Sequence, residues 1–400
     1  MIVLKYIYLF FTFFALFFCG SLTVGPLSVR NYFALSLLAI SVFGNKPFVD
    51  TTVRTFIWYL IIVIVVNILN GCFDTTLFTR MMLVYQLPSF IVVYSLPKLL
   101  QNRRDILASM ILIVILLILN SVITFGQYAG NGSAILIQSL LGYDMTDSVA
   151  DQRLGSYLGG LTGNVVNNGY FFAAMLPVSV IGLWSNKKIF RIIGYVVLLV
   201  ASYCIYIVQQ RTTFLILLAF YVFLILYKKD KILISMGLCL LSVIIYNADV
   251  FSAIDMGRLS LETSNDDRLA LFADINRFIE SSDVFLGGEQ IFYDRYNGGV
   301  QHNAFTSAIV IGGIPVFISF VWLTLKIFRS LNKYRKKANI DEIYYLPLCF
   351  GCFAYFLCSM THSTGIQNGG VLFWLLYGHI LSFDKVNSIN VKNENIISKH

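Results

Sequence analysis

The sequence predicts an all-α fold, that of a polytopic integral membrane protein with about twelve transmembrane helices. Of its 400 residues, 58% are hydrophobic and only 12% are charged, whereas soluble domains carry about 25% charged residues. The apolar residues gather in runs of roughly 16–22, close to the number that crosses about 30 Å of hydrocarbon. No stretch has the composition of a separate soluble domain, so residues 1–400 are interpreted as a single membrane domain.

The apolar runs give the helices in order. The first run could be a signal peptide, but it has no clear small-x-small cleavage site, so we interpret it as a retained helix. The sequence shows no coiled-coil heptads and no internal repeat. The predicted helices cover residues 2–18, 29–43, 55–69, 81–96, 106–125, 165–184, 189–208, 212–227, 232–246, 303–328, 343–360 and 369–383.

The sequence predicts neither a metal nor a cofactor. It contains no P-loop, no nucleotide-binding fingerprint and no zinc-protease or nucleophile-elbow motif. Cys349 and Cys352 form a lone C-x-x-C inside an apolar run. Without a second pair of ligands, the cysteines are interpreted as small buried hydrophobic residues.

The positive charges predict the orientation of the helices. Alternating loops place 21 of the 29 Lys and Arg residues in the cytoplasm and 8 outside, with both termini cytoplasmic. This asymmetry accounts for the net charge of +8, so no nucleic-acid partner is expected. All outer cations are arginines, whose planar fork suits phosphate: Arg30, Arg80, Arg153, Arg211, Arg258, Arg268, Arg277 and Arg295.

Two long loops, residues 126–164 and 247–302, face the extracytoplasmic side in this topology. Loops held by a rigid scaffold commonly carry function. In the second loop, a capping segment at Ser264–Asp267 precedes an amphipathic pattern. Leu269, Phe272, Ile275 and Ile279 form its apolar positions. The pattern predicts a helix over residues 267–281, ended by Gly287-Gly288.

The first long loop is rich in glycine near its end. Gly155, Gly159 and Gly163 recur every four residues and would give a helix a smooth face for close packing. Arg153 precedes them, and Asn164 stands where the next helix begins. Arg153 and Asn164 could line a ligand site, or the segment could be a flexible entry in which Asn164 caps the helix.

Two outer arginines stand out as candidate site residues. Arg211 lies where two predicted helices meet, a depth at which an ionisable residue is costly and often functional; snorkelling to the interface is the alternative. Arg268 lies in the first turn of the loop helix, where a surface ion pair with a neighbouring acid is the alternative. Arg277 and Arg295 are weaker candidates, because polar loops contain such residues anyway.

His302 and Asn303 open the tenth predicted helix. A histidine at this interface can titrate near neutral pH and act as a base. A lone histidine more often serves only as a hydrogen-bonding residue. Both interpretations of His302 stay open on the sequence.

These segments together resemble the O-antigen ligase and polymerase superfamily. The resemblance rests on five short motifs and on the layout of the helices: Arg211-Thr212-Thr213, Asp267-Arg268-Leu269, Phe285-Leu286-Gly287-Gly288, His302-Asn303-Ala304-Phe305 and Gly312-Gly313-Ile314-Pro315. The chain departs from the family pattern at Pro315, where Gly is usual, and at Gly287-Gly288-Glu289, where Gly-x-Gly is usual.

The resemblance implies a membrane glycosyltransferase of the bacterial cytoplasmic (inner) membrane that uses a glycan carried on undecaprenyl diphosphate. It implies that Arg211 and Arg268 bind the diphosphate and that His302 is the base or positions the acceptor. The further candidate substrate-binding residues are Arg153, Arg277, Arg295, Asn303 and Asn164. A chain-length regulator and a flippase are the expected protein partners.

Within the family, the chain most resembles a polymerase of O-antigen, capsule or exopolysaccharide repeat units. A ligase that transfers the glycan to a lipid or protein acceptor shares the same motifs. A flippase or twelve-helix carrier is the alternative from another class, although the predicted helix centres are nearly free of the charges that transporters place there. A purely structural role is the last alternative.

Overall fold

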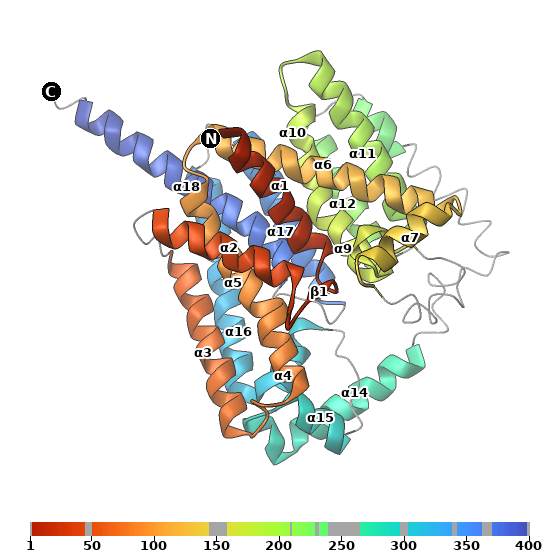
Figure 1. The fold of residues 1–400 in the computed structure, drawn as a ribbon, viewed down its shortest axis with the longest axis vertical. Coiled ribbons are helices and arrows are strands. Elements are labelled where there is room, and N and C mark those ends of the chain that lie inside the picture. The colour runs from red at the N-terminus through yellow and green to blue at the C-terminus, as the bar shows by residue number, and fades with distance from the viewer. Residues whose placement is uncertain are drawn as a thin grey trace. The chain divides into compact units, whose positions relative to one another are not determined.

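A computed structural model describes residues 2–44, 50–143, 158–208, 210–228, 232–238, 265–296, 303–337, 342–361 and 370–397. These residues are almost entirely helical (Figure 1). The helical segments among them that are long and apolar enough to cross a membrane are Thr51–Leu69, Thr76–Leu99, Arg103–Tyr128, Val165–Leu183, Lys188–Val208 and Ala304–Lys333. The chain is therefore a helical membrane protein. The count of about twelve spans and the sidedness of the loops stay predictions.

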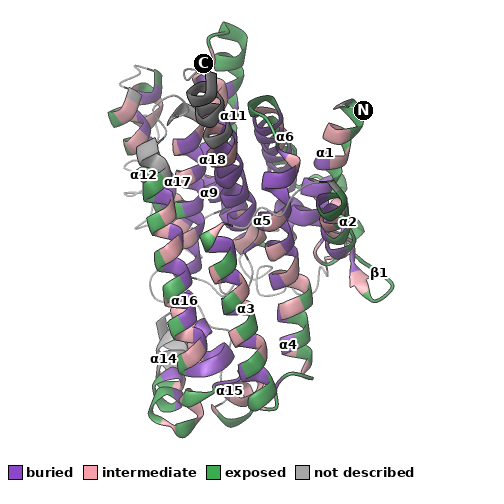
Figure 2. Ribbon diagram, turned by 90° about the vertical axis from the view of Figure 1, so that its left-hand side faces the viewer, coloured by how far each residue is buried: buried purple, intermediate pink, exposed green. Residues whose placement is uncertain are grey.

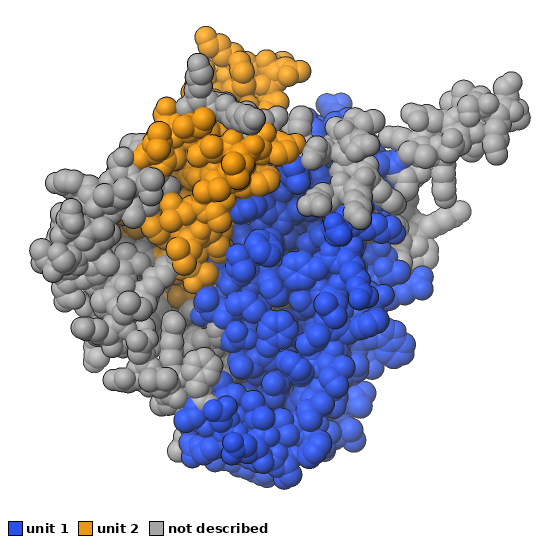
Figure 3. All heavy atoms as spheres, turned by 180° about the vertical axis from the view of Figure 1, so that it is seen from behind, with its two compact units in different colours: residues 1–113, 269–400 blue, residues 114–268 orange. Residues whose placement is uncertain are grey.

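The chain folds into two compact units, which Figure 3 colours separately. Unit 1 comprises Met1–Ile113 and Leu269–His400, and unit 2 comprises Val114–Arg268. The elements of residues 1–113 are α1 (Ile2–Phe18), β1 (Thr23–Val24), β2 (Leu27–Ser28), α2 (Val29–Gly44), α3 (Thr51–Leu69), α4 (Thr76–Arg80), η1 (Met81–Gln86), α5 (Leu87–Leu99) and the start of α6 (Arg103–Tyr128). The two strands form a short antiparallel ribbon, which the all-α prediction did not include.

The remaining elements follow in chain order. Unit 2 contains the rest of α6, then α7 (Gly132–Leu140), η2 (Gly160–Thr162), α9 (Val165–Met175), η3 (Leu176–Ser179), α10 (Val180–Leu183), α11 (Lys188–Val208) and α12 (Arg211–Lys228). The chain then continues through α14 (Asn265–Glu280), η5 (Ser282–Phe285), α15 (Glu289–Tyr296), α16 (Ala304–Lys337), α17 (Glu342–Ser359) and α18 (Val371–Ile397).

The core of unit 1 forms around the first turns of α18, which are buried (Figure 2). Trp374 stacks on Phe56 of α3 with ring centroids 4.2 Å apart. The Tyr377 hydroxyl lies 2.9 Å from both Thr52 Oγ1 of α3 and Ser330 Oγ of α16. Close packing and interhelical hydrogen bonds hold helices together in lipid, so α18 joins α3 to α16.

Prolines change the helices without ending them. The helix predicted over residues 81–96 is longer, Thr76–Leu99, and contains the π-helical turn η1. There the Leu87 N–H donates to Met82 O, five residues back, immediately before Pro88. Proline has no N–H and disturbs the regular ladder, which a wider turn accommodates. In unit 2, Pro177 lies in the tighter 3₁₀ turn η3, in the middle of the helix predicted over 165–184.

Two predicted helices extend further than their apolar runs. The helix predicted to end at residue 383 continues as α18 to Ile397, and the one predicted to end at 328 continues as α16 to Lys337. Hydropathy marks only the part of a helix that is apolar. A polar extension keeps the backbone hydrogen bonds of the helix, but its side chains are not apolar, so hydropathy does not mark it. Of the helix predicted over 232–246, residues 239–246 lie outside the described residues.

Candidate functional site

The first long loop of the prediction is largely structured where the structure describes it. α6 runs on to Tyr128, and Asn131 caps α7 by accepting hydrogen bonds from the N–H groups of Ser133 and Ala134. Gly159 and Gly163, the described glycines of the predicted smooth face, flank the short 3₁₀ turn η2 and do not lie on one helix. Gly160 and Gly163 have φ of 55° and 75°, values that glycine adopts readily and other residues rarely do. Arg153 and Gly155 lie outside the described residues.

Side-chain amides hold the Gly160 turn in place. The Gly160 N–H donates to Gln127 Oε1 at 2.9 Å, and Gln138 Nε2 donates to Gly160 O at 3.0 Å. The next N–H, that of Leu161, donates to Asn120 Oδ1 at 2.7 Å. All three amide side chains are buried. They supply the hydrogen bonds that an irregular backbone needs when no water is present.

Asn168 of α9 extends this network. Its Oδ1 accepts from Asn120 Nδ2 at 2.7 Å, and its Nδ2 donates to Leu158 O at 2.6 Å and to Thr124 Oγ1 at 3.0 Å. A Cβ atom on Gly160 would lie within 2.8 Å of the polar atoms of Asn120, Thr124 and Asn168. We call Asn120, Gln127, Gln138 and Asn168 the amide cage. It fits the turn only because residue 160 has no side chain.

Asn164 is the N-cap of α9. Its Oδ1 accepts from Val166 N at 2.7 Å and from Asn167 N at 3.4 Å. The capping interpretation of Asn164 is therefore confirmed, and a role in binding stays a prediction.

The helix predicted in the second loop is present as α14, Asn265–Glu280, and unit 1 contains it from Leu269 on. Its buried face differs from the predicted one. Ile275 and Phe278 are 4% and 0% exposed, whereas Ile279 is 42% exposed. Phe278 packs edge-on against Phe292 of α15, with centroids 5.4 Å apart, and both adjoin Val310 of α16. The contact with Phe292 decides that Ile275 and Phe278 form the buried face. Residue spacing alone would equally allow a face formed by Ile275 and Ile279.

α16 is broken near its start, where the sequence predicts an uninterrupted helix. Gly312 and Gly313 have non-helical backbone angles, with φ +63° at Gly313, and Pro315 follows. Because Pro315 has no N–H, it cannot donate to Ile311 O in the helical pattern. Asn67 Nδ2 of α3 donates to this carbonyl instead, at 3.2 Å. The glycines and the proline of one motif therefore make a break that α3 stabilises.

The Gly287-Gly288 turn packs on this break rather than ending the loop helix as predicted. α14 ends at Glu280, and the two glycines connect η5 to α15. The Gly288 N–H donates to Val310 O at 2.8 Å. A Cβ atom on Gly287 would lie 2.1 Å from Gly313 N, and one on Gly313 would lie 2.3 Å from Val284 O. Two backbones therefore meet directly, at a contact we call the glycine junction.

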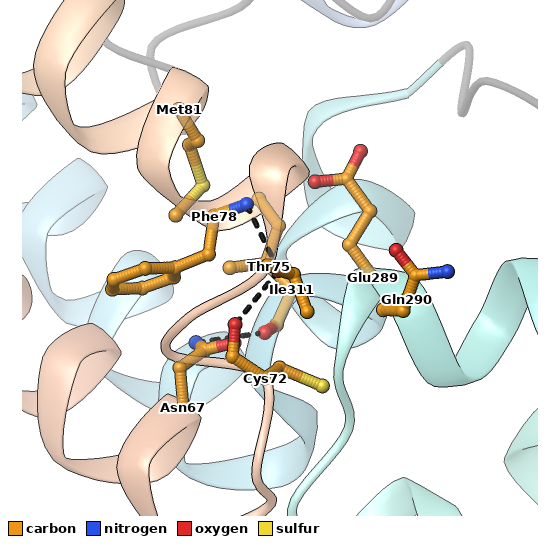
Figure 4. A pocket seen from close by; sticks show the side chains of 8 residues that line it. All are labelled: Asn67, Cys72, Thr75, Phe78, Met81, Glu289, Gln290 and Ile311. Carbon is orange, nitrogen blue, oxygen red and sulfur yellow. Dashed lines mark hydrogen bonds between the residues drawn. The ribbon is translucent and has the colours of Figure 1, made fainter.

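A small pocket lies beside the glycine junction (Figure 4). It has room for about one water molecule. Its lining comes from α3 to η1 on one side and from α15 and α16 on the other: Asn67, Cys72, Thr75, Phe78, Met81, Glu289, Gln290 and Ile311. Thr75 is fixed as the N-cap of α4, because its Oγ1 accepts from Phe78 N and donates to Cys72 O.

Glu289 is the acid of this pocket, and it was not among the candidate residues from the sequence. Burial raises the pKa of its carboxyl, and Arg80 nearby opposes the rise. Its position directly after Gly287-Gly288 is the one signal that could have singled it out. Asn67 was also missed, although a polar residue inside an apolar run is an accepted signal of function in membrane helices.

Two of the weaker candidates are paired with carboxylates. Arg277 forms an ion pair with Asp274 on the same helix. Arg295 donates to both oxygens of Asp283, at 2.9 and 3.0 Å. The side chains of both arginines are more than 60% exposed. A paired surface arginine offers less net charge to a diphosphate than an unpaired one, so these contacts favour the structural interpretation of Arg277 and Arg295.

The stronger candidates are described only in part. Arg211 is the first residue of α12, and Arg268 lies in the first turn of α14, but their side chains lie outside the described parts of the structure. His302 lies outside the described residues. Asn303 caps α16: its Oδ1 accepts from Phe305 N at 2.8 Å, and its Nδ2 donates to Met360 O at 3.2 Å.

No protein-family model matches this chain, and no curated protein matches it significantly. The functional interpretation therefore depends on the residues described above and on the motifs in the sequence.

Proposed function

We propose that this protein polymerises oligosaccharide repeat units, carried on undecaprenyl diphosphate, into surface polysaccharide at the outer face of the bacterial cytoplasmic membrane. The observation that carries the proposal is the glycine junction. Two motifs of the resemblance, Phe285-Leu286-Gly287-Gly288 and Gly312-Gly313-Ile314-Pro315, lie apart in the sequence and contact each other through their backbones. The contact explains why both motifs contain glycine, because a side chain at Gly287 or Gly313 would hold the two backbones apart.

The chemistry of the proposal is glycosyl transfer. The acceptor hydroxyl oxygen bonds to the anomeric carbon of the donor, and the bond from that carbon to the diphosphate oxygen breaks. Arg211 and Arg268 bind the diphosphate and stabilise the negative charge that it gains on leaving. Arg211 is also the first residue of α12, and a helix N-terminus favours an anion. His302 acts on the acceptor hydroxyl, as its base or by positioning it.

Alanine substitution of Arg211 or Arg268 tests the proposal. Each variant should lose long-chain polymer on a gel of surface polysaccharide while its membrane abundance stays normal. Arg277→Ala is the matched control, because it removes the same charge from an arginine already paired with Asp274. Long-chain polymer retained in both R211A and R268A would refute the assignment of these residues.

Deletion of the whole protein separates polymerase from its alternatives. A polymerase deletion leaves single repeat units on the final acceptor and no long chains. A ligase deletion leaves polymer on the lipid carrier and nothing on the acceptor. Unpolymerised lipid-linked units trapped on the cytoplasmic face would indicate a flippase.

A further inference from the structure

We propose that Glu289 is the proton acceptor for the hydroxyl that attacks the donor, an inference that rests on the proposed glycosyl transfer. In the reaction the hydroxyl proton moves to the Glu289 carboxylate as the new C–O bond forms. The electron pair of the broken bond leaves with undecaprenyl diphosphate. His302 then positions the acceptor rather than taking its proton.

The surroundings of Glu289 suit a general base. It is the first residue of α15 and lines the pocket opposite Thr75 and Phe78 (Figure 4). Within the described part of the chain, its carboxylate accepts no hydrogen bond from another side chain. A carboxylate without such a donor keeps its lone pairs available for a substrate hydroxyl. The pocket, with room for about one water, has space for one hydroxyl group.

The charges around the carboxyl are few. Arg80 faces it from the end of α4, Cys72 lines the same pocket after α3, and Tyr293 lies one turn further along α15. Among the described residues, burial raises the pKa of Glu289, of Cys72 and of Tyr293, and the charge of Asp294 on α15 raises the pKa of Cys72 further. The thiol and the phenol therefore stay neutral at neutral pH, and the carboxyl is the base of the group.

The direction of the pKa shift agrees with the role. A general base works best when its pKa is near the pH at which it operates, and enzymes raise carboxyl pKa values by burial to achieve this. A base must be deprotonated to act. The transfer rate should therefore fall as the pH decreases through the raised pKa of Glu289.

The test measures the transfer rate against pH, with the purified protein in proteoliposomes and lipid-linked repeat units from the host strain. Wild-type protein should show an acid limb in its rate profile. Glu289→Gln should lower the rate roughly 100-fold or more and remove that limb. Glu289→Asp, which keeps a carboxyl, should restore part of the rate together with the limb.

Two controls decide the interpretation. Glu280→Gln makes the same change at an exposed acid of α14 and should leave the profile unchanged. His302→Asn should lower the rate but keep the acid limb. A limb lost in H302N and kept in E289Q would overturn the proposal and make His302 the base. A transfer rate that falls in E289Q and is not partly restored in E289D would also overturn the proposal, since that result indicates a structural role for Glu289.

Failure of the proposed function is recognisable separately. If wild-type protein transfers no glycan from undecaprenyl diphosphate, and its activity is therefore no different from that of R211A and R268A, the polymerase proposal itself is wrong. If wild-type protein is active and E289Q is equally active, only the assignment of Glu289 is wrong.

Discussion

The Gly160 turn of unit 2 and the glycine junction of unit 1 solve one problem in two ways. Each is a stretch of irregular backbone among apolar helices, where unpaired N–H and C=O groups are costly. At Gly160, the partners are the side chains of the amide cage. At the glycine junction, the main partner is another backbone: the Gly288 N–H meets Val310 O. The first solution depends on side-chain amides, and the second depends chiefly on glycines that let two backbones meet, with Asn67 Nδ2 donating to the free carbonyl of Ile311.

The largest effect should come from adding a side chain at the glycine junction. In Gly313→Ala, the Cβ would lie 2.3 Å from Val284 O at φ +63°, so the two backbones must separate. We expect a loss of more than about 3 kcal/mol in folding free energy, seen as loss of monodisperse protein in detergent. Gly71→Ala is the control: it has φ +74° but open space around it, so only about 1–2 kcal/mol should be lost.

A second experiment compares the loss of one amide in each unit. Asn168→Ala removes three hydrogen bonds of the amide cage and should cost about 2 kcal/mol. Asn67→Ala removes the donor to Ile311 O but leaves the backbone contacts of the glycine junction, so about 1 kcal/mol is expected. Thermal unfolding midpoints of the two purified variants give the comparison. An equal loss, or a larger loss in N67A, would contradict the distinction between the two regions.

The smallest effect concerns the cost of the half-buried Glu289 carboxyl. Because the pKa of Glu289 is raised in the folded protein, the folded state binds this proton more readily than the unfolded state. Stability therefore falls as the pH rises from the ordinary value of 4.5 through the raised pKa. Glu289→Gln should stabilise the folded protein at pH 7 by on the order of 1 kcal/mol, seen as a higher thermal midpoint, and should not do so at low pH. Glu280→Gln should leave the thermal midpoint unchanged both at pH 7 and at low pH.

The sequence predicted the positions of most helices because a helix that crosses the lipid needs a run of about 20 apolar residues, which is visible in the sequence. It predicted α14 from a cap and a helical period. It did not predict the break in α16, although Gly312, Gly313 and Pro315 were recognised as a motif, because hydropathy does not change across them. The break becomes necessary only when Gly287 and Asn67 are placed beside it.

The candidate site shows the same limit. The choice of Phe278 over Ile279 for the buried face of α14 depends on Phe292, which belongs to another helix. Glu289 is one of many loop acids in the sequence, and only its half-buried position beside Thr75 and Cys72 distinguishes it. Arg277 and Arg295 were candidates by residue type. Asp274 lies three residues before Arg277 on the predicted helix, whereas the acid that pairs with Arg295 is known only from the fold.

The hydrogen bond between Asn67 and Ile311 also bears on how the chain is made. Its two residues are 244 positions apart, so at a synthesis rate of about 5–20 residues per second Ile311 follows Asn67 by roughly 10–50 s. During that interval α3 must reside in the membrane without its later partner. Asn67 Nδ2 also donates to Val63 O, one turn back on its own helix, at 2.9 Å. The amide is therefore satisfied within the nascent helix first, and it gains its long-range acceptor only when the second glycine motif has been translated.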